Sequence, residues 1–392
     1  MLREPVASAS RPAASAGVLS ITEALTTPTE TRPTGEVELD RVLGVGLVPG
    51  AVILLVGEPG IGKSTLLLTL AGTSATVGPV VYVSGEETAG QIARRASRMG
   101  VTSDGIQLVA TQSLDGAASP IRKLSPSLVI VDSVQTIGIE SLPNPLGSVV
   151  QIREVTLELG RLARELMVPI ILVGHVTKDG DVAGPKVLEH LVDAVLLLEG
   201  DRQHDLRLLR TVKNRFGATD EVGVFAMTEK GLEAVSNPSA RFLDGRSTAV
   251  PGSAVVATVE GTRALLVELQ ALAQPTQFGY AKRTASGYDT NRLQLMLAVL
   301  EQRAKIPAGR FDVYLNVVGG IKLKEPAVDL GVCLAVASAI RQLPVPADLA
   351  VWGEVGLSGE IRKVSVAPKR AAEAKRLGFS WLSETTQLAT FL

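Results

Sequence analysis

The sequence predicts an α/β domain with a mostly parallel sheet and helices on both faces, followed by a smaller α+β domain. From about Val37 to Val235, short apolar runs alternate with amphipathic stretches, which is typical of strand–helix repetition in a parallel sheet. A polar stretch with Pro and Gly interrupts this pattern at residues 237–252. Beyond it, strands and helices are predicted in mixed order, and 392 residues suffice for two domains.

The first domain is expected over residues 35–236, after a disordered leader of residues 1–34 rich in Ala, Ser, Thr and Pro. Its predicted strands are five apolar runs, at residues 52–57, 80–85, 106–110, 128–133 and 169–176. A helix starting near Ser148 carries a regular apolar face and ends before Pro169. After the predicted linker, residues 237–252, the second domain covers residues 253–392, with helices at residues 290–302, 326–341 and 367–377.

The composition excludes several classes of protein. The net charge is −1, so no global positive field indicates a nucleic-acid partner, and any such surface has to be local. The single cysteine, Cys333, excludes an internal disulfide and a cysteine-only zinc site within one chain, and is expected to be a small buried residue. No apolar stretch approaches the roughly 20 residues that span a bilayer, and no signal pattern is present. We expect a reducing, cytoplasmic location and no membrane partner.

The strongest signal is GEPGIGKST, Gly57–Thr65, which follows a predicted strand and opens a predicted helix, as a P-loop does. Glycines let backbone N–H groups curl around phosphate oxygens, and the helix N-terminus adds partial positive charge. Lys63 is expected to reach the β- and γ-phosphates of ATP and Ser64 to ligate Mg²⁺, whereas Thr65 is the weaker candidate. The predicted nucleotide contacts are Gly57, Glu58, Pro59, Gly60, Ile61, Gly62, Lys63, Ser64 and Thr65.

Three carboxylates follow other strands of the predicted sheet. Asp132 ends the run LVIVDS and fits the Walker B carboxylate that holds Mg²⁺. Glu86 and Glu87 come directly after another strand, at the edge where open α/β sheets bind ligands. We predict that one of them, preferably Glu86, activates the attacking water. The alternative is an acidic pair favoured by a helix dipole, and it weighs more for Glu87.

Five segments together resemble the bacterial RadA (Sms) family of DNA repair proteins. They are the P-loop, SGEET (84–88), VDSVQT (131–136), the VTKDG–AGPKVLEH loop (176–190) and KNRFG (213–217). The resemblance covers essentially everything from about Thr34 to the C-terminus. It implies a RecA-like, DNA-dependent ATPase that forms a homo-oligomeric ring, a hexamer, and binds single-stranded and branched DNA. It further implies ATP-driven branch migration in recombinational repair, alongside a RecA-type recombinase.

The resemblance also suggests roles for particular residues. Glu86 follows Gly85 directly, the position of the catalytic glutamate in RecA-like ATPases. Lys213 and Arg215, expected in an exposed turn, would act across a subunit interface on the γ-phosphate charge, or else are two solvated cations. His175, at a strand end near the phosphate edge, would sense the γ-phosphate, or else is a satisfied strand-end histidine.

The second domain is similar to the proteolytic domain of Lon, chiefly at residues 353–379. The Ser–Lys dyad of Lon is missing, because no hydroxyl residue lies between Pro326 and Ser338 and Pro368 aligns with the lysine. We therefore expect a non-proteolytic scaffold for ring assembly and DNA contact. Candidate DNA contacts, each with a solvated charge as the alternative, are Lys178, Lys186, Lys322, Lys324, Lys369 and Arg370, near the further basic residues Arg362, Lys363, Lys375 and Arg376.

One departure from the family concerns zinc. The family normally carries an N-terminal four-cysteine zinc finger, whereas no cysteine precedes Cys333. Either this is a truncated form or its start is assigned downstream, so we expect no zinc in this chain, and functions tied to the finger are in doubt. An alternative function is a KaiC-like module that uses the same core to bind ATP and partner proteins without moving on DNA.

Overall fold

The computed structural model describes residues 20–22, 30–175, 185–200, 204–247, 250–277, 279–381 and 387–391. The chain divides into two units, Met1–Glu30 and Thr31–Leu392, because most contacts are made within each unit. The second unit is described below. Among the described residues, no helix combines the length and the apolar character needed to cross a bilayer.

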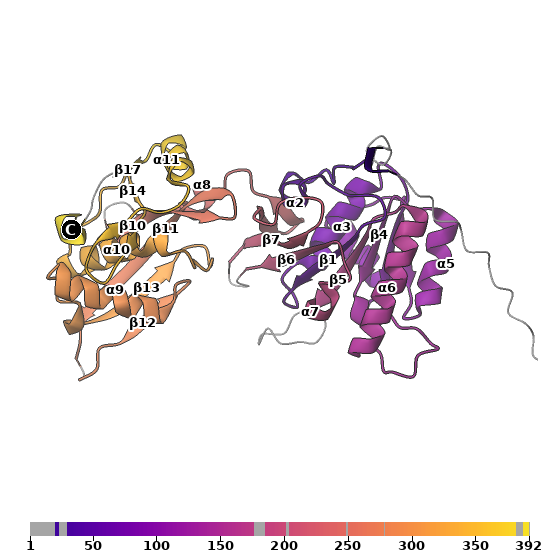
Figure 1. Ribbon diagram of the computed structural model, residues 1–392, viewed down its shortest axis with the longest axis horizontal. Helices are drawn as coiled ribbons and strands as arrows, with labels where there is room; N and C mark the ends of the chain where they lie inside the picture. Colours follow the sequence, from indigo (N-terminus) through magenta and orange to yellow (C-terminus); the bar gives the residue numbers. More distant parts are fainter. Residues whose placement is uncertain are drawn as a thin grey trace, which may run out of the picture. The chain divides into compact units, whose positions relative to one another are not determined.

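The first domain is built on one large sheet. Its strands are β1 (Val52–Gly57), β2 (Val80–Ser84), β3 (Ile106–Ala110), β4 (Leu128–Asp132), β5 (Ile170–His175), β6 (Ala194–Glu199), β7 (Leu206–Asn214), β8 (Val222–Thr228) and β9 (Gly231–Ala234). Within the described residues these nine strands lie in the order β3-β2-β4-β5-β1-β6-β7-β8-β9 (Figure 1). The six strands from β3 to β6 run parallel, and β7 to β9 continue the sheet as antiparallel neighbours.

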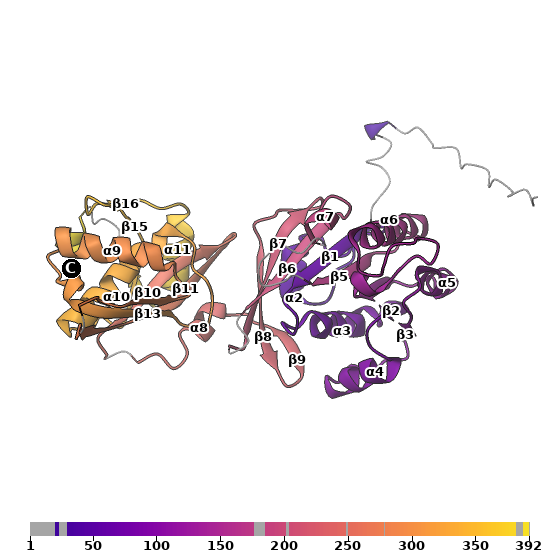
Figure 2. The ribbon, with the colours of Figure 1, turned by 90° about the horizontal axis from the view of Figure 1, so that it is seen from below.

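Helices cover both faces of this sheet, as the sequence predicts (Figure 2). They are α2 (Val37–Leu43), α3 (Lys63–Ser74), α4 (Ala89–Arg98), α5 (Leu114–Leu124), the 3₁₀ turn η1 (Val134–Thr136), α6 (Val149–Leu166) and α7 (Pro185–Leu188). One apolar core joins the sheet to Leu39, Leu67 and Ile92 of α2, α3 and α4. A second core joins it to Ile121 and Val155 of α5 and α6. The α/β class of this domain is therefore confirmed.

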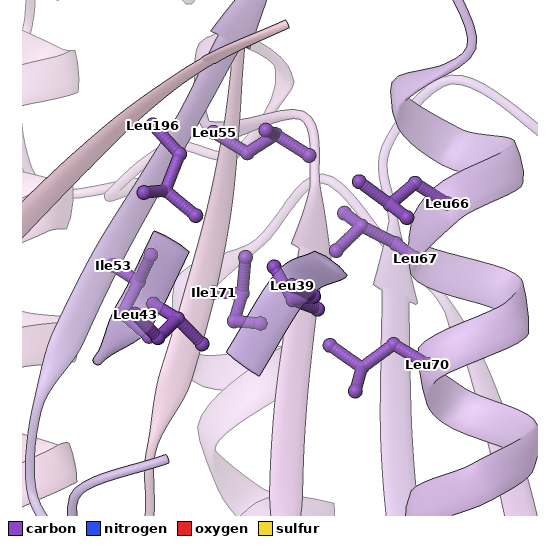
Figure 3. Close-up of a pocket in the computed structure, with 9 residues that line it drawn as sticks. All are labelled: Leu39, Leu43, Ile53, Leu55, Leu66, Leu67, Leu70, Ile171 and Leu196. Carbon is purple, nitrogen blue, oxygen red and sulfur yellow. The ribbon is translucent and has the colours of Figure 1, made fainter. Parts of the chain in front are cut away.

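Helix α3, which follows the predicted P-loop, is fixed in the first of these cores. Figure 3 shows Leu66, Leu67 and Leu70 of α3 pointing toward Ile53 of β1 and Leu39 of α2, around a small apolar cavity. All five side chains are buried. Because β1 and α3 are both fixed in one core, the loop between them is held at both ends.

The second domain contains a mixed sheet and helices, as predicted. Its strands are β10 (Ser253–Glu260), β11 (Arg263–Pro275), β12 (Arg283–Ser286), β13 (Phe311–Val317), β14 (Leu349–Val351), β15 (Glu354–Val355), β16 (Ile361–Arg362) and β17 (Ser380–Trp381). Its helices are α9 (Thr290–Arg303), η2 (Ala308–Arg310), η3 (Pro326–Val328), α10 (Asp329–Arg341), α11 (Ala367–Arg376) and α12 (Leu388–Phe391). Among the described residues, six strands form the sheet β12-β13-β11-β10-β14-β17, with parallel and antiparallel pairs. Cys333 of α10 is buried in the core, as expected.

The structure refines the expected boundaries of the domains. Most of the predicted leader lies outside the described residues, but Thr34 is already buried and its N–H donates to Asp40 Oδ1 at 2.7 Å. The predicted linker contains the short helix α8 (Pro238–Phe242), whose Phe242 is buried. The predicted linker thus includes a short packed helix. The sequence did not indicate this helix because the stretch has no apolar periodicity.

Candidate nucleotide-binding site

The loop between β1 and α3 has the backbone geometry of an anion cradle. Gly62 adopts a left-handed conformation with φ 118° directly before α3, and an added Cβ would come within 2.8 Å of Met227 Cε. At Gly57 an added Cβ would lie 2.6 Å from the carbonyl oxygen of Leu198. Glycine is therefore required at both positions: at Gly62 for its backbone conformation, and at Gly57 because the backbone approaches β6 closely. The N-terminus of α3 adds the partial positive charge that favours phosphate.

Lys63 closes onto its own loop. Its Nζ donates to the carbonyl oxygens of Gly57 at 2.8 Å and Glu58 at 3.0 Å, and the residue is only 4% exposed. Burial lowers the pKa of Lys63 to about 8, while the carboxylates of Asp132 and Glu86 act in the opposite direction. A buried ammonium group held by two carbonyl oxygens is suited to exchange them for phosphate oxygens, which would favour its charged form.

Asp132 lies at the end of β4, two strands from β1, in the position predicted for the Walker B carboxylate. Its Oδ2 accepts a 2.6 Å hydrogen bond from the hydroxyl of Tyr82, a fully buried residue of β2. Burial and the Asp132 carboxylate together raise the pKa of Tyr82 well above its usual value, so the tyrosine stays a donor. Ser64 is partly exposed in the first turn of α3. Asp132 and Ser64 are the residues that would hold Mg²⁺ beside the phosphates.

The two glutamates after β2 have different partners. Their backbone N–H groups both donate to the Ser84 hydroxyl, at 3.3 Å for Glu86 and 3.0 Å for Glu87. The carboxylate of Glu87 is held by the guanidinium of Arg95, at 2.8 and 2.5 Å. The carboxylate of Glu86 instead accepts from the Ser133 hydroxyl at 2.8 Å. Glu86 is thus the glutamate that is not engaged by an arginine, which agrees with the preference stated from the sequence.

His175 ends β5 opposite Gly57, as the register of the two strands places it. Its Nε2 lies 3.6 Å from Glu86 Oε1. Burial and the charge of Lys63 lower the pKa of His175, which favours the neutral imidazole. Within the described part of the chain, its buried Nδ1 has no hydrogen-bond partner. The proposed role of His175 as a sensor of the γ-phosphate stays a prediction.

The sequence predicts that Lys213 and Arg215 lie in an exposed turn, and for Lys213 this prediction is wrong. Lys213 belongs to β7 and is partly buried, and its Nζ donates to the carbonyl oxygens of Glu189 at 2.5 Å and Val192 at 2.8 Å. Arg215 is exposed and pairs with Asp193 at 3.1 Å. The strand continues further than expected because the antiparallel pairing of β7 with β6 extends to its end. Neither cation is simply solvated.

The candidate DNA contacts other than Arg370 fall into two groups. Lys178 and the side chain of Lys186 lie outside the described residues. The exposed members are Lys322, Lys324 and Lys369, the last of which donates to the Thr262 carbonyl oxygen at 3.1 Å.

Arg370 is a correction to the sequence-based prediction. It is fully buried, and its guanidinium binds the Ala257 carbonyl oxygen at 2.5 Å and forms an ion pair with Glu325. A buried, paired guanidinium is not available to a phosphate backbone. The position on α11 explains the error, because neighbouring basic residues face solvent whereas Arg370 lies on the inner face of the helix.

Sequence reasoning missed three residues that support the site. Tyr82 and Ser133 contact Asp132 and Glu86 respectively, and Arg207 of β7 is buried with its Nε donating to the Ile61 carbonyl oxygen at 3.1 Å. Arg207 thus binds the P-loop from β7, which lies two strands from β1. A signal was available for Tyr82, which interrupts the apolar run VVYV at residues 80–83, but not for Arg207, whose strand carries several other polar residues.

A glycine-rich loop between a strand and a helix, with a carboxylate at the end of a strand two positions away in a mostly parallel sheet, defines a P-loop ATPase core of the RecA-like class. The family model described as AAA domain matches residues 26–181. "DNA repair protein RadA" of Halalkalibacterium halodurans is 50% identical over 343 residues, which are 87% of this chain and 75% of that protein. The chain belongs to the RadA family of DNA repair proteins.

Two further relatives of the same name have similar identities. The Bacillus subtilis protein is 48% identical over 344 residues, 87% of this chain and 75% of its own length. The Pseudomonas aeruginosa protein is 50% identical over 346 residues, 88% of this chain and 76% of its own length. Among solved structures, one described as an ATPase domain aligns with a TM-score of 0.47 at 18% identity, covering 55% of this chain and 99% of that chain.

Proposed function

We propose that this protein is a DNA-dependent ATPase of recombinational repair, which drives branch migration on single-stranded and branched DNA. The proposal rests on one observation in a chain of the RadA family: Lys63, Asp132 and Glu86 lie at the same edge of the sheet. The charge of each of the two carboxylates acts on the buried ammonium group, so the three groups share one electrostatic environment. Such a set fits phosphoryl transfer from ATP to water.

Each group has a distinct part in hydrolysis. The P-loop N–H groups and Lys63 bind the phosphates and neutralise the charge that develops during transfer. Bound Mg²⁺, held by Ser64 and Asp132, would supply further charge neutralisation. Glu86 aligns the attacking water and accepts its proton.

Lys213 and Arg215 act on the nucleotide of a neighbouring subunit in a homo-oligomeric ring, a hexamer. The register of the sheet supports this. Lys213 pairs with Val195 on β6, which pairs with Leu54 on β1, three residues before Gly57 and thus roughly 10 Å back along the strand. The Lys213 ammonium group also points toward the loop that precedes β6, away from the phosphate edge. A group so placed is poorly situated for its own ATP, and a second subunit would complete the site.

The proposed partners of this protein, DNA among them, rest on its family and on the charge of its surface residues. Lys322, Lys324 and Lys369 are exposed cations that suit contact with a phosphate backbone, and Lys178 would add to them. In this proposal the protein works alongside a RecA-type recombinase and is located in the cytoplasm.

The second domain serves assembly and not proteolysis. Asp329, fully buried at the start of α10, accepts from the Tyr288 hydroxyl at 2.8 Å and from Arg292 at 2.7 and 2.5 Å. This stretch offers no nucleophile for a Ser–Lys mechanism, since the first hydroxyl residue after Pro326 is Ser338. Its polar groups stabilise the fold instead.

A branch-migration assay tests the proposed motor. A labelled joint molecule with a short heteroduplex is incubated with the protein and ATP, or with a non-hydrolysable ATP analogue. We expect the wild type and a Lys230→Ala control, changed at an exposed lysine, to extend the heteroduplex only with ATP. Lys63→Ala is expected to be inactive. Equal extension with the analogue would remove branch migration from the account, and no extension together with ATP-dependent binding of a protein partner would favour the KaiC-like module.

A further inference from the structure

The closest polar contact of Glu86 is a residue that the proposed mechanism does not use. The Ser133 hydroxyl donates to Glu86 Oε1 at 2.8 Å, whereas His175 Nε2 lies 3.6 Å from the same oxygen, beyond an ordinary hydrogen bond. The side chain of Glu86 is 48% exposed. A glutamate with that exposure samples several rotamers unless a partner fixes it.

Ser133 is itself rigidly placed. It is fully buried at the end of β4, next to Asp132, and its carbonyl oxygen accepts from the Thr136 hydroxyl at 2.8 Å. Thr136 in turn packs against Gly85, where an added Cβ would lie 2.4 Å from its Oγ1. The end of β4 and the segment that carries Glu86 are therefore in tight contact, and the hydroxyl is held where it meets the carboxylate.

We propose that Ser133 is a positioning residue for Glu86. Its hydroxyl binds Oε1 and so orients the carboxylate, which leaves Oε2 to accept a hydrogen bond from the attacking water. The same strand end presents Asp132 to the metal side of the site, so one short segment, Asp132–Ser133, sets the geometry of both carboxylates. This inference rests on the proposed role of Glu86 in hydrolysis.

The serine has no part in holding the nucleotide, because its hydroxyl is engaged by Glu86 and the residue is fully buried. Its loss should therefore slow the chemical step without weakening ATP binding. Misplacement of a catalytic group by about 1 Å costs on the order of 100-fold in rate. We expect Ser133→Ala to lower kcat by roughly 10- to 100-fold.

The experiment measures kcat, KM for ATP and the affinity for a fluorescent non-hydrolysable ATP analogue. For Ser133→Ala we expect the loss in kcat with KM and analogue affinity unchanged within about twofold, the signature of an interaction made only during catalysis. Ser133→Thr keeps the hydroxyl and should restore most of kcat. Ser133→Cys keeps the size but is a weak donor, so its kcat should fall even though it fills the same space. Ser97→Ala, at an exposed serine of α4, is the matched control and should match the wild type.

Glu86→Gln separates this inference from the proposed function. If Glu86→Gln abolishes turnover while Ser133→Ala and Ser133→Cys keep wild-type kcat, Ser133 does not position Glu86, and the ATPase assignment stands. If Glu86→Gln keeps wild-type kcat, the assignment of the base itself fails. The double variant Ser133→Ala/Glu86→Gln should be no slower than Glu86→Gln alone, and a further additive loss would overturn the inference. A rise in KM at unchanged kcat would likewise overturn it.

Discussion

The hydroxyl of Tyr82 donates a 2.6 Å hydrogen bond to Oδ2 of Asp132, and the two buried residues lie on the neighbouring strands β2 and β4. The bond supplies a donor to a carboxylate that water reaches poorly. Tyr82→Phe removes the donor and little else, so the buried oxygen is left without its partner. We expect the free energy of unfolding to fall by about 1–3 kcal/mol. Chemical denaturation measures this loss.

A matched control for this variant is Tyr280→Phe, because Tyr280 is 91% exposed. It should change the free energy of unfolding by less than about 0.5 kcal/mol. Equal effects of the two variants would show that the hydroxyl of Tyr82 does not stabilise the buried carboxylate.

The lowered pKa of Lys63 predicts a pH dependence. The free protein holds Lys63 charged below about pH 8 and neutral above it, because burial disfavours the ammonium form. A neutral lysine does not neutralise phosphate charge, so kcat/KM for ATP should fall as the pH rises through about 8. At saturating ATP the phosphates favour the charged form, so kcat itself should fall only at higher pH. Steady-state rates between about pH 6.5 and 9.5 test this, and a kcat/KM that stays level throughout would contradict it.

Breaking the Arg370–Glu325 ion pair should destabilise the protein and not merely weaken DNA binding. Glu325 also accepts from the Val259 N–H at 2.9 Å, so Arg370 belongs to a polar cluster beneath α11. Arg370→Ala removes the cation that pairs with Glu325 and leaves the space of a fully buried side chain unfilled, with an expected loss of about 3–5 kcal/mol in the free energy of unfolding. Lys363→Ala, at an exposed residue, is the control and should be nearly neutral. Thermal or chemical unfolding of both variants decides between a structural and a DNA-contacting arginine.

Action in trans predicts complementation between two inactive variants. Lys63→Ala lacks the phosphate lysine, and Lys213→Ala lacks the cation that a neighbour would supply. When the two are mixed and allowed to exchange subunits, interfaces form that combine an intact P-loop with an intact Lys213, so ATP hydrolysis should return. Because Lys213 also binds the carbonyl oxygens of Glu189 and Val192 within its own chain, failure of complementation would assign it that structural role alone.

The sequence predicted the α/β fold and the P-loop well because both depend on local signals. The apolar runs gave β1 and β4 with little error, and the glycine spacing located Lys63. Those patterns reflect burial and backbone conformation, which a single segment encodes. They were sufficient for the α/β class and for the order of the two domains.

What the sequence could not supply was the set of contacts between distant segments. Ser133 meets Glu86 across 47 positions of the chain, and Arg207 meets Ile61 across 146. The burial of Arg370 depends on Glu325 and on β10, not on the pattern of α11. Charged residues on a helix are usually solvated, so a sequence pattern does not reveal the one whose partner lies elsewhere.

The most direct test of the central claim is ATP hydrolysis measured with and without single-stranded DNA at low salt. The wild type is expected to hydrolyse ATP faster when DNA is present. Lys63→Ala should lose hydrolysis, and Lys213→Ala should lose the response to DNA. Hydrolysis by the wild type that is indifferent to DNA would contradict the account, and would favour an ATP-regulated protein-binding module built on the same core.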